Sequence, residues 1–152
     1  MPKNIMITIN QEKKPFPQGI TVEEVVDRVF PDRQIPIVGA RICNEIRELS
    51  YRLEEDCTID FLDLTDEDGI RIYVRGLSFI FIRAVRELYP GARVTIEHSL
   101  SKGLYCEIHW KRPMTPRDIA AVEKRMEAIV EANEPFVKMQ VSKEKAIEIF
   151  SK

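Results

Sequence analysis

Within the first 30 residues, apolar side chains first recur at every second position and then at every third or fourth position. This change in period limits the folds that the chain can adopt. Ile5, Ile7 and Ile9 alternate with other residues, which is the period of a strand with one buried side. Thr21 and Glu24 then have the spacing of a capping box at a helix start. They open a stripe typical of one helix face, with apolar residues at positions 22, 25, 26, 29 and 30.

Short strands are expected on either side of this helix. A return strand is predicted from residue 15, and further strands over 37–42 and 58–62. Two strands, a helix and further short strands in this order are typical of a β-grasp fold. The stretch 66–69, Asp-Glu-Asp-Gly, is acidic and is predicted to be a turn between domains. We therefore predict a β-grasp domain over residues 1–66.

The second half of the chain predicts an α+β domain over residues 70–152. Its first helix is expected to begin near Arg75 and to end at the Pro90-Gly91 pair. Residues 93–110 alternate as a β-hairpin with one covered side. Thr115 has the position and chemistry of a helix cap. Helices packed on one face of an antiparallel sheet would give an α+β sandwich-type domain, so the whole chain is predicted to be α+β.

Charge is unevenly distributed along the chain, whose formal net charge is −2. Residues 1–70 hold 8 Lys or Arg and 15 Asp or Glu, a charge of −7, whereas residues 71–152 hold 15 and 10, a charge of +5. The second half is therefore the better candidate for binding an anionic ligand. No apolar run approaches a membrane span, no signal peptide is apparent, and three widely spaced cysteines lack a CxxC pair. These features predict a cytoplasmic protein.

Neither a metal site nor a nucleophile is predicted. His98, Cys106 and His109 are residue types that zinc favours, but Cys106 and His109 are three positions apart in one strand and face opposite sides. His98 and Ser99 are neighbours without a third group to orient them. We therefore expect no catalytic residue, no metal and no cofactor in this chain.

Polar residues of the second half are predicted to form a pocket for an anion. Arg75 and Arg83 are eight positions apart on one helix and share roughly one face. The turn after His98 supplies amides, hydroxyls and a cation that suit phosphate or carboxylate, so a nucleotide or tRNA is the expected ligand. The alternative, an ordinary charged rim, stays open. The predicted ligand-binding residues are Arg75, Ser78, Arg83, His98, Ser99, Lys102 and Tyr105.

A second surface is predicted at a turn of the first domain. Because residues 1–70 are acidic, phosphate contacts are disfavoured there and docking of a protein is favoured. Exposed strand edges can also pair two chains, so a dimer is a further expectation. The predicted docking residues are Arg41, Asn44, Glu45 and Arg47.

Two halves of the chain resemble two consecutive domains of one enzyme family. The first resembles TGS domains, the β-grasp modules of threonyl-tRNA synthetases and of ppGpp synthetase/hydrolase proteins. The second resembles the domain that follows TGS in threonyl-tRNA synthetases, where misacylated serine is removed. The segments that carry the resemblance are ITIN, PFPQGITVEEVVDRVF and VGARICNEIRELSYRLEEDCTIDFLDL in the first half, and AVRELYPGARVTIEHS, KGLYCEI, MTPRDIAAVEKRMEAIVEANEPF and VSKEKAIEIF in the second.

Departures from the synthetase pattern point to a second group. Synthetases carry an HxxxH pair in the first helix of the editing domain, where this chain has Arg75 and Phe79, which cannot transfer a proton near neutral pH. This loss and the variant EHSLSKGLYCEI resemble bacterial uridine or nucleoside kinase-like proteins, in which the same two domains precede a kinase domain. The chain has no GxxxxGK[ST] loop, so ATP and Mg²⁺ are expected only with a downstream kinase domain.

The resemblance therefore implies a non-catalytic regulatory, ligand-binding or RNA-binding module of a uridine kinase-like protein, with the downstream kinase domain as its partner. Two alternatives stay open. One is a tRNA-binding fragment of a threonyl-tRNA synthetase-like protein, and the other is a stand-alone hydrolase acting on aminoacyl-tRNA.

Overall fold

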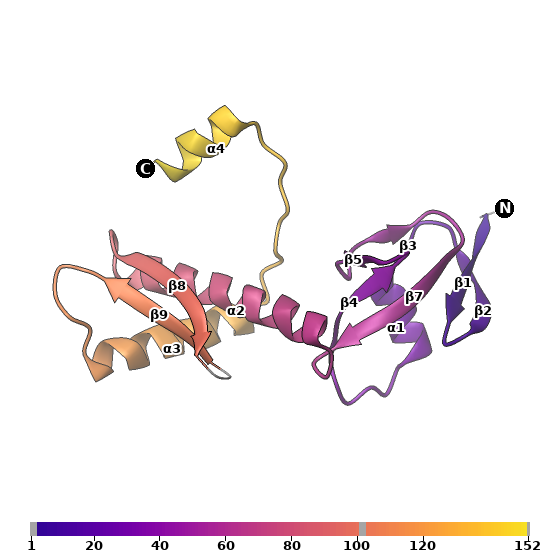
Figure 1. Ribbon diagram of the computed structural model, residues 1–152, viewed down its shortest axis with the longest axis horizontal. Coiled ribbons are helices and arrows are strands. Elements are labelled where there is room, and N and C mark those ends of the chain that lie inside the picture. The colour runs from indigo at the N-terminus through magenta and orange to yellow at the C-terminus, as the bar shows by residue number, and fades with distance from the viewer. Residues whose placement is uncertain (1–2, 101–102, 152) are drawn as a thin grey trace. The chain divides into compact units, whose positions relative to one another are not determined.

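The computed structural model describes residues 3–100 and 103–151, without the side chains of residues 98–100. The chain forms two compact units, Met1–Phe79 and Ile80–Lys152, and the division falls within the long helix α2, Glu67–Leu88 (Figure 1). Each unit has its own buried apolar core. The predicted α+β class is confirmed.

The first unit is built on a mixed five-stranded sheet with the strand order β2-β1-β7-β4-β5. Strands β1 and β7 are parallel neighbours, with Ile9 opposite Ile59, and the other pairs in this sheet are antiparallel. Strands β3 and β6 form a separate antiparallel pair. The elements are β1 Asn4–Ile9, β2 Glu12–Pro17, β3 Ile20–Thr21, α1 Val22–Val29, β4 Ile37–Ile42, β5 Glu45–Arg47, β6 Arg52–Leu53 and β7 Cys57–Asp63.

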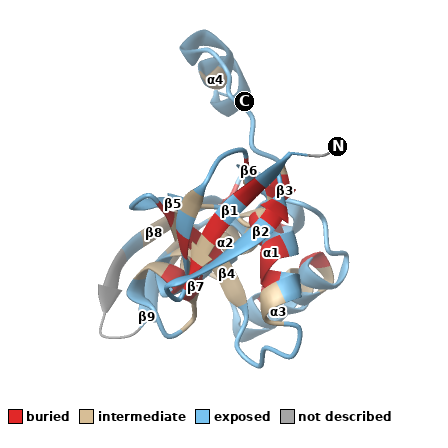
Figure 2. Cartoon of the chain, turned by 90° about the vertical axis from the view of Figure 1, so that its right-hand side faces the viewer, coloured by how far each residue is buried: buried red, intermediate tan, exposed pale blue. Residues whose placement is uncertain are grey.

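Helix α1 begins at the predicted capping box. The backbone amide of Glu24 donates to Thr21 Oγ1 at 3.2 Å, and the amide of Thr21 donates to Glu24 Oε2 at 2.8 Å. Two amides that the helix itself leaves free are thereby satisfied. The apolar stripe of α1 is buried against the sheet, as the red faces of α1 and β1 in Figure 2 show. The fully buried members of this core include Val22, Val25 and Ile7.

Helix α2 begins earlier than the sequence pattern predicts, and the turn expected over residues 66–69 is wrong. Glu67 and Asp68 instead occupy the first turn of α2, where acidic side chains stabilise the positive end of the helix dipole. Gly69 allows this start because a Cβ there would lie only 1.8 Å from the backbone oxygen of Asp63. The domain boundaries 1–66 and 70–152 stay a prediction.

The second unit packs two helices on one side of a hairpin. Strands β8, Arg93–Leu100, and β9, Gly103–His109, pair in antiparallel register, and a bulge lies between Ile96 and Ser99. Val94 and Ile108 of the hairpin pack against the core that α2 and α3, Pro116–Glu131, complete. The predicted hairpin and the predicted cap at Thr115 are therefore confirmed, with Thr115 Oγ1 accepting from the amide of Asp118.

A short helix, α4, Lys143–Phe150, follows α3 along the chain. Ser142 caps it, since its hydroxyl accepts a hydrogen bond from the amide of Lys145 at 3.3 Å. The residues between α3 and α4 form no strand and are exposed. Within the described residues, no helix combines the length and apolar character that a membrane crossing requires.

Candidate functional site

The predicted anion pocket draws residues from both units. On α2, Arg75 is exposed, and the hydroxyl of Ser78 donates to the carbonyl oxygen of Val74 at 2.8 Å within the helix. Arg75 and Ser78 belong to the first unit, whereas Arg83 belongs to the second. The side chains of His98 and Ser99, and all of Lys102, lie outside the described residues. The pocket as a whole therefore stays a prediction.

Arg83 is held in a network of ion pairs within the second unit. Its guanidinium donates to Glu87 at 2.8 Å and to Glu134 at 2.7 Å, and Glu87 also accepts from Arg125 at 2.5 Å. The carboxylates of Glu134 and Glu87 raise the pKa of Arg83, so its charge is fixed. An anionic ligand would have to compete with two carboxylates for this guanidinium.

Tyr105, the remaining predicted ligand residue, belongs to a polar row along β9. Its hydroxyl donates to Glu107 Oε1 at 3.1 Å, and His109 Nε2 lies 2.9 Å from Glu107 Oε2. The hydrogen bond to Glu107 raises the pKa of the Tyr105 phenol. These three side chains share one side of the strand because they are spaced by two, as the alternation predicts. We name them the β9 row.

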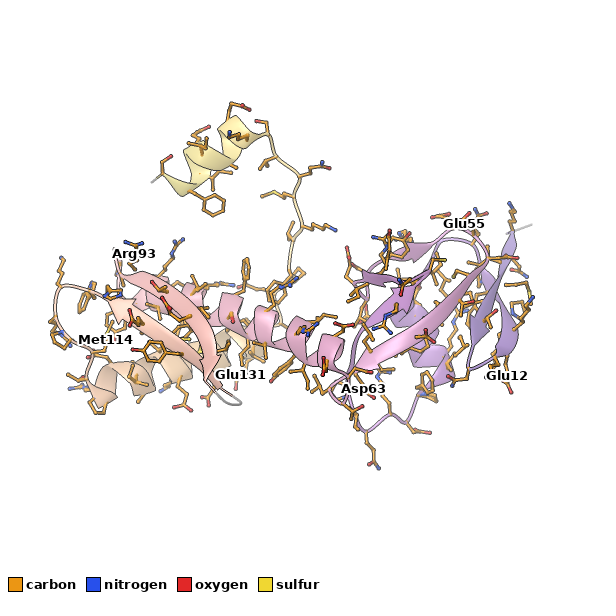
Figure 3. The ribbon with its side chains drawn as sticks, viewed as in Figure 1. Glu12, Glu55, Asp63, Arg93, Met114 and Glu131 are labelled. Atoms are coloured by element: carbon orange, nitrogen blue, oxygen red, sulfur yellow. The ribbon has the colours of Figure 1, made fainter. Side chains whose placement is uncertain are left out.

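Strand β8 extends this polar side of the hairpin. Arg93 lies opposite His109 in the register, and Thr95 lies opposite Glu107. Arg93, which Figure 3 labels at the start of β8, is exposed. Arg93, Glu107 and His109 are not among the predicted binding residues, although their period of two within a predicted hairpin is a signal that could have identified them.

Zinc binding by the hairpin finds no support in its geometry. Cys106 pairs with Ile96 in the register and so lies on the opposite side of the hairpin from the β9 row. Its Sγ lies 4.0 Å from the carbonyl oxygen of Leu104. Across the residues that the structure describes, no three His, Cys, Asp or Glu side chains converge in a way that could hold a metal ion.

A buried carboxylate fixes the connection between β9 and α3. Asp118 accepts hydrogen bonds from Arg112 at 2.7 and 2.9 Å, from the Thr115 hydroxyl at 2.6 Å and from the Tyr89 hydroxyl at 3.0 Å. Arg112 and Thr115 hold the pKa of the Asp118 carboxyl far below its usual range. The Arg112 guanidinium also lies 5.2 Å from the ring of Trp110. This network positions the end of the hairpin that carries His109.

The predicted docking residues of the first unit surround the turn between β4 and β5. Arg41 is paired with Asp68 at 2.7 Å, and Arg47 bonds the carboxylate of Glu45. Asn44 lies in the turn with a φ of 65°, a conformation that asparagine tolerates well. Glu45 and Arg47 line a pocket of about 230 Å³, and the role of this surface in docking stays a prediction.

Fold and site together define a β-grasp unit followed by an α+β unit whose hairpin presents a polar face. No protein-family model matches the chain. The chain is similar to the threonine–tRNA ligase of Symbiobacterium thermophilum, with 35% identity over 136 residues, covering 90% of this chain and 21% of that protein. The threonine–tRNA ligase of Polaromonas sp. is 30% identical over 147 residues, covering 96% of this chain and 23% of that protein. The chain thus spans about a fifth of the length of these relatives.

These similarities show that the expected nucleoside kinase-like function is wrong, and with it the expected kinase partner. Three relatives that each align with at least nine tenths of the chain are threonine–tRNA ligases. The kinase interpretation depended on a short variant segment and on Arg75 and Phe79 in place of two histidines. Substitutions at two positions of one helix are weaker evidence of function than similarity along both units.

Proposed function

We propose that this chain is a tRNA-binding module of a threonyl-tRNA synthetase-like protein and binds tRNA without catalysing a reaction itself. The observation that carries this proposal is the similarity to threonine–tRNA ligases over 90% of the chain. The name of these relatives gives tRNA as the substrate of their ligation reaction.

The charge of the second half supports RNA as the ligand. Several cations of the second unit are exposed and make no ion pair with any residue that the structure describes. They can pair with the phosphate groups of RNA, and such pairing provides much of the affinity when proteins bind nucleic acids. These cations are Arg86, Arg93, Lys111, Arg117 and Lys124.

The polar side of the hairpin supports the same ligand. Arg93 lies opposite His109 at one end of the hairpin, and Lys111 follows His109 by two residues, so two cations belong to this end of the hairpin. Tyr105 is 48% exposed and offers a ring on which an unpaired base can stack. We therefore place the tRNA contact on this side of the second unit.

Two residues of helix α2 are the reason that we propose binding without catalysis. At the two helical positions where the synthetase resemblance implies histidines, the chain has Arg75 and Phe79. A guanidinium stays protonated at neutral pH and a phenyl ring carries no exchangeable proton, so neither acts as a general base. Binding without hydrolysis is the function that these residues permit.

A binding measurement tests the proposal directly. Fluorescently labelled tRNA specific for threonine is titrated with the chain by anisotropy at several salt concentrations. We expect saturable binding that weakens as salt rises, and several-fold weaker binding with a smaller salt dependence for the double variant Arg93→Ala, Lys111→Ala. Arg28→Ala, an exposed arginine of the acidic first unit, is the matched control and should bind as the unaltered chain does.

Two results would contradict the proposal. The first is no saturable binding up to about 100 µM protein at low salt, a concentration at which even non-specific RNA binders associate. The second is an equal loss of affinity in the Arg28→Ala control and in the double variant, since the contact would then not lie on the hairpin.

A further inference from the structure

An open pocket of about 450 Å³ lies in the first unit, away from the turn that carries the predicted docking residues. Its volume is within the range of about 300–1,000 Å³ that small-molecule sites occupy. Three separate stretches of the chain form its wall. The lining residues are Asn10, Phe30, Arg33, Gln34, Ile35, Ile37, Phe61 and Asp63.

The pocket lies at the carboxyl ends of two parallel strands, a place where ligands bind in other folds. Asn10 directly follows β1, and Asp63, labelled in Figure 3, is the last residue of β7. Because β1 and β7 are parallel, their carboxyl ends meet at the same edge of the sheet. In open α/β sheets, ligands bind in the crevice outside the carboxyl ends of the parallel strands, and this mixed sheet offers one such parallel pair.

The walls of the pocket are apolar and include two aromatic rings. Phe30 and Phe61 pack edge to face, with ring centroids 5.5 Å apart and an angle of 87° between the planes. Ile35 is 45% exposed although it is a large apolar side chain, so apolar surface is available to a ligand. Ile37 adds a partly buried side chain at the start of β4. Flat rings bury apolar area well against such walls.

The rim of the pocket is polar and suits the edge of a heterocycle. Asn10 and Gln34 are exposed amides, each with donors and an acceptor. Arg33 donates to Asp27 at 2.9 Å, so its charge is compensated. The Asp63 carboxylate accepts from the amide and hydroxyl of Thr65 at 2.7 and 2.6 Å, and these bonds lower the pKa of Asp63 and keep it ionised.

The charges of the first unit distinguish between a phosphate group and an uncharged ring as the ligand of this pocket. Residues 1–70 carry 15 acidic against 8 basic side chains, and the one cation of the pocket lining is already paired with Asp27. A phosphate group inside the pocket would therefore meet net repulsion, so an uncharged ring is favoured over a phosphate as the group that enters it. Unpaired RNA bases are recognised in this way, by aromatic contact and by hydrogen bonds to their edges.

We propose that this pocket binds a neutral nucleobase, presented either by a free nucleoside or by an unpaired base of RNA. This proposal extends the proposed tRNA-binding function, and it rests on that function only where the base belongs to RNA. Purines are the preferred ligands because their larger ring buries more apolar area, and Asp63 adds an acceptor for the N–H donors of guanine or the amino group of adenine.

The test follows backbone amide resonances of the full chain by NMR during titration with nucleosides at millimolar concentration. We expect adenosine and guanosine to shift residues 33–37 and 61–63 in a saturable manner, and uridine to shift them less. Ile35→Asp places a charge in the pocket and should weaken binding about tenfold or more, since a bound ring would cover an unpaired carboxylate where apolar surface stood before. Ile46→Asp is the matched control, because Ile46 is 46% exposed in the same unit but does not line the pocket.

Further titrations distinguish free nucleosides from RNA as the ligand, and both from a peptide. A short single-stranded RNA that binds more weakly than its nucleosides assigns the site to free nucleosides, and one that binds more tightly assigns it to RNA. A basic peptide with a central phenylalanine that shifts the same amides while nucleosides do not would overturn the proposal in favour of protein docking. Silent nucleoside titrations with intact tRNA binding would overturn this inference alone, whereas loss of tRNA binding with normal nucleoside shifts would overturn the proposed function alone.

Discussion

Among the described residues of the second unit, Asp118 is a carboxylate on which three other side chains converge. Arg112, Thr115 and Tyr89 all donate to its carboxylate, which is 8% exposed. The same carboxylate completes the cap of α3 by accepting from the amide of Thr115 at 2.8 Å. One side chain therefore joins the residue that follows α2, the segment that follows β9 and the start of α3, and its ionised form is the one that all these donors favour.

Replacing this carboxylate is expected to lower stability in a manner that depends on pH. The pKa of Asp118 is lower in the folded chain than in the unfolded chain, so its stabilisation is present above the ordinary carboxyl pKa of about 4 and is lost as the pH falls below it. Asp118→Asn should lower the Tm at neutral pH by about 5 °C or more, and the difference from the unaltered chain should shrink between about pH 5 and pH 2.

Thermal unfolding followed by circular dichroism across this pH range measures the effect. Glu123→Gln, an exposed carboxylate on the same helix, is the control and should change the Tm little at any pH. A difference between Asp118→Asn and the unaltered chain that stays constant with pH would show that the charge of Asp118 contributes nothing.

Helix α2 shows at the scale of an element what the sequence pattern predicts and what it does not. Its end before Pro90, the caps at Thr21 and Thr115 and the alternation of the hairpin depend on neighbours within a few residues, so they were predictable. Its start depends on the close approach of Gly69 to Asp63, a contact that exists only after β7 and α2 have folded.

Two glycines of α2 should therefore respond oppositely to the same substitution. Gly69→Ala puts a Cβ 1.8 Å from the backbone oxygen of Asp63, so the helix start must shift, at a cost of about 1–3 kcal/mol. Gly76→Ala meets no atom within 4 Å and should stabilise the chain by about 0.5–1 kcal/mol, since alanine is the better helix former.

Urea unfolding measures both variants against the unaltered chain. Because the two substitutions are chemically identical and lie in one helix, each is the control of the other. Equal effects of the same sign would contradict the close packing of Gly69 against Asp63.

At the scale of the whole molecule, the order of the longer helices and strands was predictable but the functional surfaces were only partly so. The β9 row follows from a period of two within one strand. The proposed nucleobase pocket does not, because its walls come from residue 10, residues 30–37 and residues 61–63, which only the sheet brings together. The assignment to a kinase-like protein was wrong because two substituted positions in α2 were weighed above similarity along the whole chain.

The same two positions predict that the chain does not deacylate seryl-tRNA. Arg75 and Phe79 provide no proton acceptor near neutral pH. The imidazole of His109 is 61% exposed and contacts Glu107, and among the described residues it has no hydrogen bond to a hydroxyl or thiol that could act as a nucleophile. Incubation of the chain with radiolabelled seryl-tRNA specific for threonine should release serine at the rate of buffer alone. Release above that rate, lost in His109→Ala but retained in the Arg28→Ala control, would instead make the β9 row the active site of an aminoacyl-tRNA hydrolase.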